Sequence, residues 1–229
     1  MSKKGKLTRK ELKEDHFAET VGEAVFYVKH HSRRIVGALI VIIVIVIGVT
    51  FSIRQRRAAE IEAQAILARG NFDFKQGNYE AALRTYSGIR QRYRGTWSAA
   101  DATFFSGNAY FAAGQYDSSA VLYDEYLNQG KRRDDLTVSA KIGIAQSLEE
   151  KGLYEDAANN FLKTQQEHPD NVLAKDALLG AARCFRLAGS LDRAIEIYND
   201  LMDLYPDSRE AELARMQVLE LEVRSKRGS

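Results

Sequence analysis

Residues that could carry out chemistry are few in this chain, and they are scattered. Four histidines lack the spacing of metal ligands: His16, His30, His31 and His168. Cys184, the only cysteine, falls within an apolar helical pattern, which indicates a buried and inert thiol. The acidic pairs Asp134-Asp135 and Glu149-Glu150 fit solvated helix ends better than an acid–base dyad. Since phosphate-binding loops and G-x-S-x-G motifs are also missing, we expect no catalytic residue, metal site or cofactor, and a binding protein rather than an enzyme.

What the chain does carry is a repeat. A glycine recurs at intervals of 37, 38 and 37 residues, with an amphipathic helical pattern before and after each one: Gly77, Gly114, Gly152 and Gly189. An aromatic residue lies nine positions after each glycine: Tyr86, Tyr123, Phe161 and Tyr198. Glycine permits the positive φ that ends a helix, and the aromatic would fill the gap between successive helix pairs. One helix pair cannot bury its apolar face alone, so we expect an all-α solenoid of about four stacked repeats.

The repeat also predicts where the helices begin and end. The expected pairs are 58–76 and 79–93, 97–113 and 116–129, 136–151 and 154–167, and 172–188 and 191–204. A last amphipathic helix over 208–225 would cover the open end of the stack. Pro169 and Pro206 end the second helices of the last two repeats, because proline cannot donate the backbone bond. The first two repeats lack this proline, so Gly95 and Gly130 are the expected stops there.

These repeated positions resemble the tetratricopeptide repeat family over roughly residues 60–208. The family's early small residue is matched by Gly70, Gly107, Ala145 and Ala182. Its later alanine is matched by Ala82, Ala157 and Ala194, with Ser119 in the second repeat. The resemblance implies a protein-binding groove lined by the first helix of each pair. The groove-facing positions that it implies are Asn71, Phe74, Asn108, Phe111, Gln146, Arg183 and Arg186.

Two kinds of residue suggest how that groove would hold a peptide. Asn71 and Asn108 resemble the asparagine that clamps a C-terminal carboxylate in some tetratricopeptide domains, but Leu67 stands near the place of the accompanying lysine. We therefore expect no carboxylate clamp. An apolar groove is the other interpretation, although the rings that would form it suit a core equally well: Phe74, Phe104 and Phe111. Trp97, the only tryptophan, would serve either packing or binding.

One apolar run, Ile35 to Ile53, holds 19 residues without a charge. As a helix it would be roughly 28 Å long, close to the ~30 Å hydrocarbon core of a bilayer. Arginines close both ends of the run, which predicts a transmembrane helix over 35–53. Two alternatives remain: an unusually apolar core helix, or a cleaved signal peptide, against which the long preceding segment argues.

The segment before this run is basic. Residues 1–34 carry nine Lys and Arg against five Asp and Glu. An amphipathic helical pattern follows Thr8, and it would lie on the membrane surface or present a stripe to a partner. A basic tail beside an acidic solenoid favours lipid head groups over nucleic acid. We expect the N-terminus in the cytoplasm and the domain 58–229 on the other side of the membrane.

This layout of tail helix, span and solenoid resembles the YfgM-like family of bacterial inner-membrane proteins. The resemblance implies an ancillary subunit of the Sec translocon whose periplasmic domain helps to hand exported chains to chaperones. Its partners would be translocon subunits, periplasmic chaperones or exported chains. An envelope scaffold for outer-membrane assembly or cell-division-linked complexes is the alternative, because Tyr205-Pro206-Asp207-Ser208 resembles repeats of the BamD and YbgF type. Cleavage after Ala65 would favour that alternative.

Overall fold

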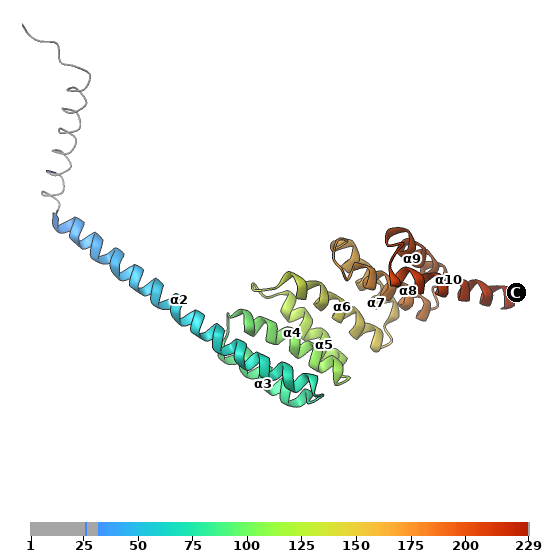
Figure 1. Ribbon diagram of the computed structural model, residues 1–229, viewed down its shortest axis with the longest axis horizontal. Helices are drawn as coiled ribbons and strands as arrows, with labels where there is room; N and C mark the ends of the chain where they lie inside the picture. The colour runs from blue at the N-terminus through green and yellow to red at the C-terminus, as the bar shows by residue number, and fades with distance from the viewer. Residues whose placement is uncertain (1–25, 27–31, 229) are drawn as a thin grey trace, which may run out of the picture. The chain divides into compact units, whose positions relative to one another are not determined.

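The computed structural model describes Phe26 and residues 32–228, which are all-helical without a strand (Figure 1). The helices are α2 (Ser32–Lys75), α3 (Tyr79–Arg92), α4 (Trp97–Ala112), α5 (Tyr116–Leu127), α6 (Asp134–Glu150), α7 (Tyr154–Glu167), α8 (Ala174–Leu187), α9 (Leu191–Leu204) and α10 (Arg209–Gly228). The chain divides into two units, Met1–Arg56 and Arg57–Ser229. The predicted amphipathic helix after Thr8 lies outside the described residues.

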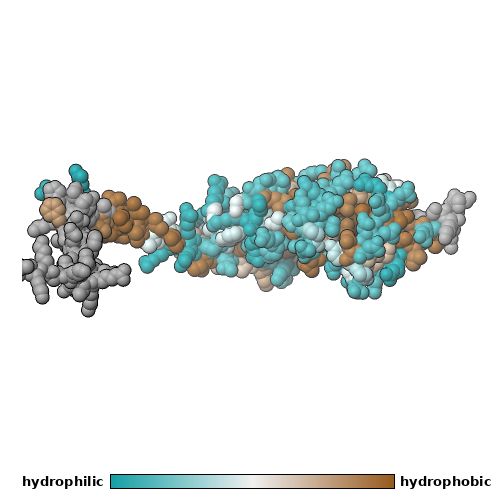
Figure 2. Space-filling model, turned by 90° about the horizontal axis from the view of Figure 1, so that it is seen from above, coloured by the Kyte–Doolittle hydropathy of each residue, from teal (hydrophilic) through white to brown (hydrophobic). Residues whose placement is uncertain are grey.

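Helix α2 joins two segments that we expected to be separate, the apolar run and the first helix of the first repeat. No glycine or proline lies between Ile53 and Ala58, and the arginines, glutamine and alanines there favour helix, so nothing interrupts it. One stretch of the described chain, Leu39–Lys75, is long and apolar enough to cross a membrane, and its most apolar window is not buried. Figure 2 shows these exposed apolar side chains as a brown segment.

The expected helix pairs are confirmed. Apart from the start of the first helix, which lies within α2, their ends agree with the structure to within two residues. The four turn glycines adopt the left-handed conformation that ends a helix, with φ of 78° at Gly77, 73° at Gly114, 77° at Gly152 and 82° at Gly189. Gly95 does the same after α3, with φ of 78°. Gly130 was the wrong stop, since it lies outside this conformation and α5 has already ended at Leu127.

Aromatic rings fill the spaces between successive pairs, as the repeat predicts. Tyr86 is fully buried, and its ring lies against Gly70, where an added Cβ would come within 2.6 Å of the ring. Tyr123 is held between α4 and α6, so a Cβ would come within 2.8 Å of it at Gly107 and within 2.4 Å at Gly143. The small residues at these positions of the first helices therefore leave the space that the rings occupy.

The first helices form the inner layer of the solenoid. Helices α4 and α6 contact each other directly, as do α8 and α10, whereas α6 and α8 and the successive second helices from α3 to α9 make at most marginal contact. A stack whose first helices approach more closely than its second helices curves with the first helices inside. At the C-terminal end, Ala214 and Leu221 of α10 pack into the same core cluster as Phe185 and Tyr198.

Candidate functional site

A cleft opens on the inner layer of the Arg57–Ser229 unit, across α2, α4 and the start of α6. Its volume is about 520 Å³. We call it the inner cleft, and its lining residues are Glu60, Gln64, Leu67, Ala68, Asn71, Trp97, Ser98, Asp101, Phe105 and Arg133. The lining mixes carboxylate, amide, indole and apolar groups, which is the composition of a site that recognises both the shape and the polarity of a ligand.

Helical spacing explains why these residues share one surface. Trp97, Asp101 and Phe105 follow one another at intervals of four along α4, so they lie on one face of that helix. Glu60, Gln64 and the residues that follow them on α2 repeat the arrangement. Two parallel rows of side chains therefore form the walls of the inner cleft.

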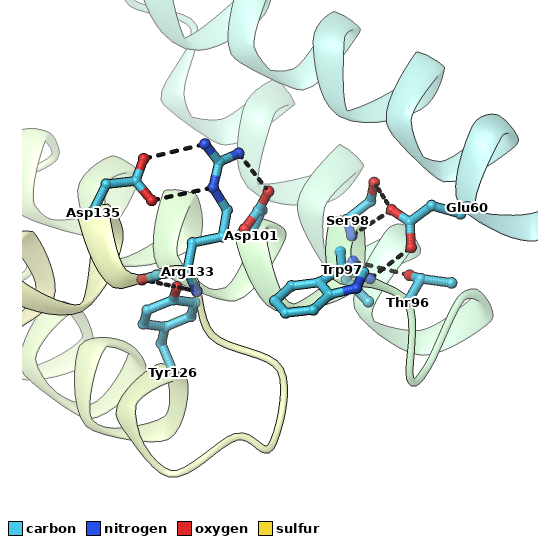
Figure 3. A network of polar contacts seen from close by, with 9 residues as sticks. Glu60, Thr96, Trp97, Ser98, Asp101, Tyr126, Arg133 and Asp135 are labelled. Atoms are coloured by element: carbon cyan, nitrogen blue, oxygen red, sulfur yellow. Dashed lines mark hydrogen bonds and ion pairs between the residues drawn. The ribbon is translucent and has the colours of Figure 1, made fainter. Parts of the chain in front are cut away.

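Glu60 of α2 links the two walls through hydrogen bonds to α4 (Figure 3). Its carboxylate accepts hydrogen bonds from the backbone N–H of Trp97 at 2.6 Å, and from the backbone N–H and hydroxyl of Ser98 at 2.8 and 2.6 Å. Burial raises the pKa of Glu60, but these bonds together outweigh burial and lower the pKa below its ordinary value. The first N–H groups of α4 thus bind a carboxylate from another helix, in addition to the N-cap that Thr96 supplies to Ala99.

Asp101 also lines this cleft, and the hydrogen-bonding capacity of its side chain is incompletely satisfied. It is only 8% exposed. Its Oδ2 lies 3.6 Å from Arg133 Nη1, while the same guanidinium binds Asp135 at 3.1 and 3.3 Å (Figure 3). Burial raises the pKa of Asp101, and Arg133 opposes that rise. Its Oδ1 is buried and accepts no hydrogen bond from any group of the described chain.

Arg133 is held in place through its own backbone. Its N–H donates to the hydroxyl of Tyr126 at 2.8 Å, and Arg133 is the N-cap of α6. From the loop before α6, the half-exposed side chain of Arg133 bridges Asp101 and Asp135.

The two predicted groove asparagines occupy equivalent places in consecutive repeats. Asn71 Oδ1 accepts a hydrogen bond from the Tyr86 hydroxyl at 2.8 Å, and Asn108 Oδ1 accepts one from the Tyr123 hydroxyl at 2.7 Å. Asn71 lines the inner cleft. Because each Oδ1 is engaged, what these amides can offer a ligand is their N–H donors, which suit peptide carbonyl groups.

The predicted groove aromatics lie against the hairpin turns. The ring of Phe74 packs on Tyr79 with centroids 5.6 Å apart, and Phe111 packs on Tyr116 at 5.4 Å. Phe104 is 5% exposed and belongs to a core cluster. These rings contribute hydrophobic packing, and the aromatic surfaces that line the inner cleft are Trp97 and Phe105.

The remaining predicted residues lie further along the solenoid. Gln146 is exposed on α6. Arg183 binds Glu149 through two hydrogen bonds of 2.6 and 2.7 Å. Arg183 and Arg186 line another, smaller pocket of about 210 Å³ between α8, α9 and α10, so the structure does not bring them to the inner cleft.

Sequence reasoning missed the residues at the centre of the inner cleft, above all Asp101 and Arg133. The signal that could have found them is the four-residue spacing of Trp97, Asp101 and Phe105 on a first helix. Trp97 is 46% exposed, so packing alone does not account for its position. In the part of the chain that the structure describes, no three His, Cys, Asp or Glu side chains gather as metal ligands.

Comparisons with known proteins agree with this architecture. The tetratricopeptide repeat family matches residues 67–135 and 140–209, together more than half of the chain. The crystal structure of YrrB, described as a TPR protein with an unusual peptide-binding site, is 16% identical, with a TM-score of 0.52 over 67% of this chain and 74% of YrrB. MamA from Desulfovibrio magneticus RS-1 is 16% identical, with a TM-score of 0.53 over 71% of this chain and 96% of MamA. Identities this low show the fold alone, and no curated protein matches the chain in sequence.

Proposed function

The chain belongs to the tetratricopeptide repeat family, and we propose that it is a membrane-anchored adaptor that binds a segment of another protein in its inner cleft. Proteins of this fold serve as scaffolds for protein–protein interaction. The observation that carries the proposal is the inner cleft itself, which spans two successive first helices and the N-cap of a third, and presents polar and aromatic groups together. YrrB, which has a peptide-binding site according to its description, offers a precedent on a similar fold.

The apolar part of α2 supports an anchor in the membrane. Side chains such as Val44 and Ile47 are 62% and 61% exposed, which would be unfavourable in water over so long a stretch. A span at 35–53 would concentrate the cleft at the membrane surface, so that even a weak site would be occupied by partners held at the same surface. We place the N-terminus in the cytoplasm and the solenoid in the periplasm of a bacterial cell.

In that setting the adaptor would assist protein export. Extended chains that emerge from the Sec translocon, and the chaperones that receive them, are the partners that suit a cleft with donors for peptide carbonyls. Asn71, Asn108, Gln146, Arg183 and Arg186 would line the path along the inner layer, while Phe74 and Phe111 would support it from the turns.

A crosslinked pull-down from native membranes tests this function. Ala68 is exposed and lines the inner cleft, so Ala68→Phe would fill the cleft; Ala65→Phe, at an exposed position of α2 outside the lining, is the matched control. We expect translocon subunits or periplasmic chaperones with the unaltered chain and with the control, and their loss with Ala68→Phe. Enrichment of outer-membrane assembly or division proteins would instead support the scaffold alternative. Partners that persist equally in both variants would overturn binding in the cleft.

The topology has its own test. Val121 is 65% exposed on α5, whereas the native Cys184 is buried, so Val121→Cys supplies an accessible thiol. We expect a membrane-impermeant maleimide to label it once the outer membrane is permeabilised. Labelling only after the inner membrane is broken would reverse the orientation.

A further inference from the structure

We infer that the inner cleft holds a basic side chain, lysine or arginine, of the bound segment, with Asp101 as the acceptor that recognises it. The inference rests on the proposed function, because it names the chemistry of what the cleft binds. It follows from the unpaired oxygen of Asp101, from the charges around it and from the indole that shares its wall.

The unpaired oxygen is the primary observation. The side chain of Asp101 is 11% exposed and lines the inner cleft, yet its Oδ1 receives no hydrogen bond from the described residues. A buried acceptor without a donor is costly, and native proteins keep few of them. A donor that a ligand brings to the carboxylate from the cleft would satisfy it once the carboxylate turns toward the cleft.

The guanidinium of Arg133 does not supply this hydrogen-bond donor. Arg133 lies 3.6 Å from the other oxygen of Asp101, beyond an ordinary hydrogen bond, and its better contacts are to Asp135 at 3.1 and 3.3 Å. Glu60 adds a second carboxylate to the lining. Carboxylates therefore outnumber guanidinium groups around the cleft, so a cationic donor is favoured over a neutral one.

The indole of Trp97 suits a cation as well. It lies one helical turn before Asp101 on the same wall and is 46% exposed. Its ring already attracts one ammonium, because Lys131 Nζ lies 5.8 Å from the ring centroid, and Lys131 lines a neighbouring cleft rather than this one. An aromatic face beside a carboxylate is a combination that binds the stem and the head of a lysine or arginine.

The test uses the full chain in detergent micelles, where Trp97 is the only tryptophan and its fluorescence reports the cleft directly. The probes are short capped peptides of alanine, leucine and glutamine that are identical except for a central lysine, arginine, norleucine or glutamate. We expect the lysine and arginine peptides to bind the unaltered chain most tightly. Asp101→Asn should weaken them about ten- to hundredfold, the loss expected for a charge-assisted bond, and leave the norleucine peptide nearly unchanged.

Asp176→Asn is the matched control. Asp176 occupies the same place relative to its turn glycine as Asp101 does, but it is exposed and lies outside the inner cleft. The control removes the same charge and should not change binding. Equal binding of all four peptides, each lost with Ala68→Phe, would refute the basic preference while leaving the adaptor function intact. Binding of all four peptides that survives Ala68→Phe would refute both.

Discussion

The carboxylate of Glu60 accepts two hydrogen bonds from Ser98, one from its backbone N–H at 2.8 Å and one from its hydroxyl at 2.6 Å. The two residues belong to the first helices of different repeats, so the contact joins α2 to the beginning of α4. Both residues line the inner cleft, as does Trp97, which lies between Thr96 and Ser98 in the chain. Removing the carboxylate charge should therefore weaken both the stack and the cleft.

Glu60→Gln should lower the free energy of unfolding by about 1–2 kcal/mol, because it weakens charge-assisted bonds at a helix N-terminus. Urea denaturation followed by circular dichroism measures the change. Glu62→Gln is the control. Glu62 is exposed, and its carboxylate makes a weak ion pair with Arg92 at 4.0 Å, so the change in the free energy of unfolding should stay within about 0.5 kcal/mol. Equal losses in the two variants would contradict the role given to Glu60.

The same contact predicts a dependence on pH. The pKa of Glu60 is lowered by folding, so its contribution to stability is present above its ordinary value of 4.5 and is lost as the pH falls through the folded-state pKa. Glu60→Gln should therefore destabilise the solenoid at neutral pH and have little effect in acid. A loss of stability that is the same at both pH values would contradict this assignment.

Gly143→Ala should destabilise the solenoid by about 1–3 kcal/mol, because the new Cβ would lie 2.4 Å from the ring of buried Tyr123. Gly88→Ala should have the opposite effect on stability. Gly88 lies inside α3 with no atom within 4 Å of an added Cβ, so alanine there should stabilise by about 0.5–1 kcal/mol. Thermal unfolding of both variants should shift in opposite directions. Stabilisation by Gly143→Ala would show that the ring is not wedged against the helix.

Asp101→Asn should raise stability at neutral pH by about 1 kcal/mol, although it removes a native charge. Burial raises the pKa of Asp101, so its contribution is most favourable in acid and is lost as the pH rises through the folded-state pKa. Arg133 keeps Asp135 as a partner. A marked destabilisation at neutral pH would mean that Asp101 is structural rather than a binding residue.

Cys184 should resist thiol reagents until the solenoid unfolds. It is fully buried, and burial raises the pKa of its thiol to about 12, which leaves very little thiolate at neutral pH. Maleimide labelling should follow the urea unfolding curve, whereas a cysteine at Val121 should react without denaturant. Rapid labelling of Cys184 in the native chain would contradict the packing of α8.

The repeat made the architecture predictable. The glycines at the turns and the aromatics nine residues later each have a single physical reason, and both lie where the spacing placed them. The site was less predictable, because it depends on contacts between helices. The position of Asn71 on the cleft lining follows from its place in the repeat. The ion pair of Asp101 depends on Arg133, which lies in a loop after another helix. Nothing in the local sequence marks that contact.

The most direct test of the adaptor is photocrosslinking from inside the cleft in native membranes. A benzophenone amino acid replaces Gln64, which lines the inner cleft, or Val121, which is exposed on the second helix α5. Crosslinks to another protein from position 64 and not from position 121 are the predicted result. Crosslinks from position 121 alone would show that partners bind the outer layer, and would contradict the central claim.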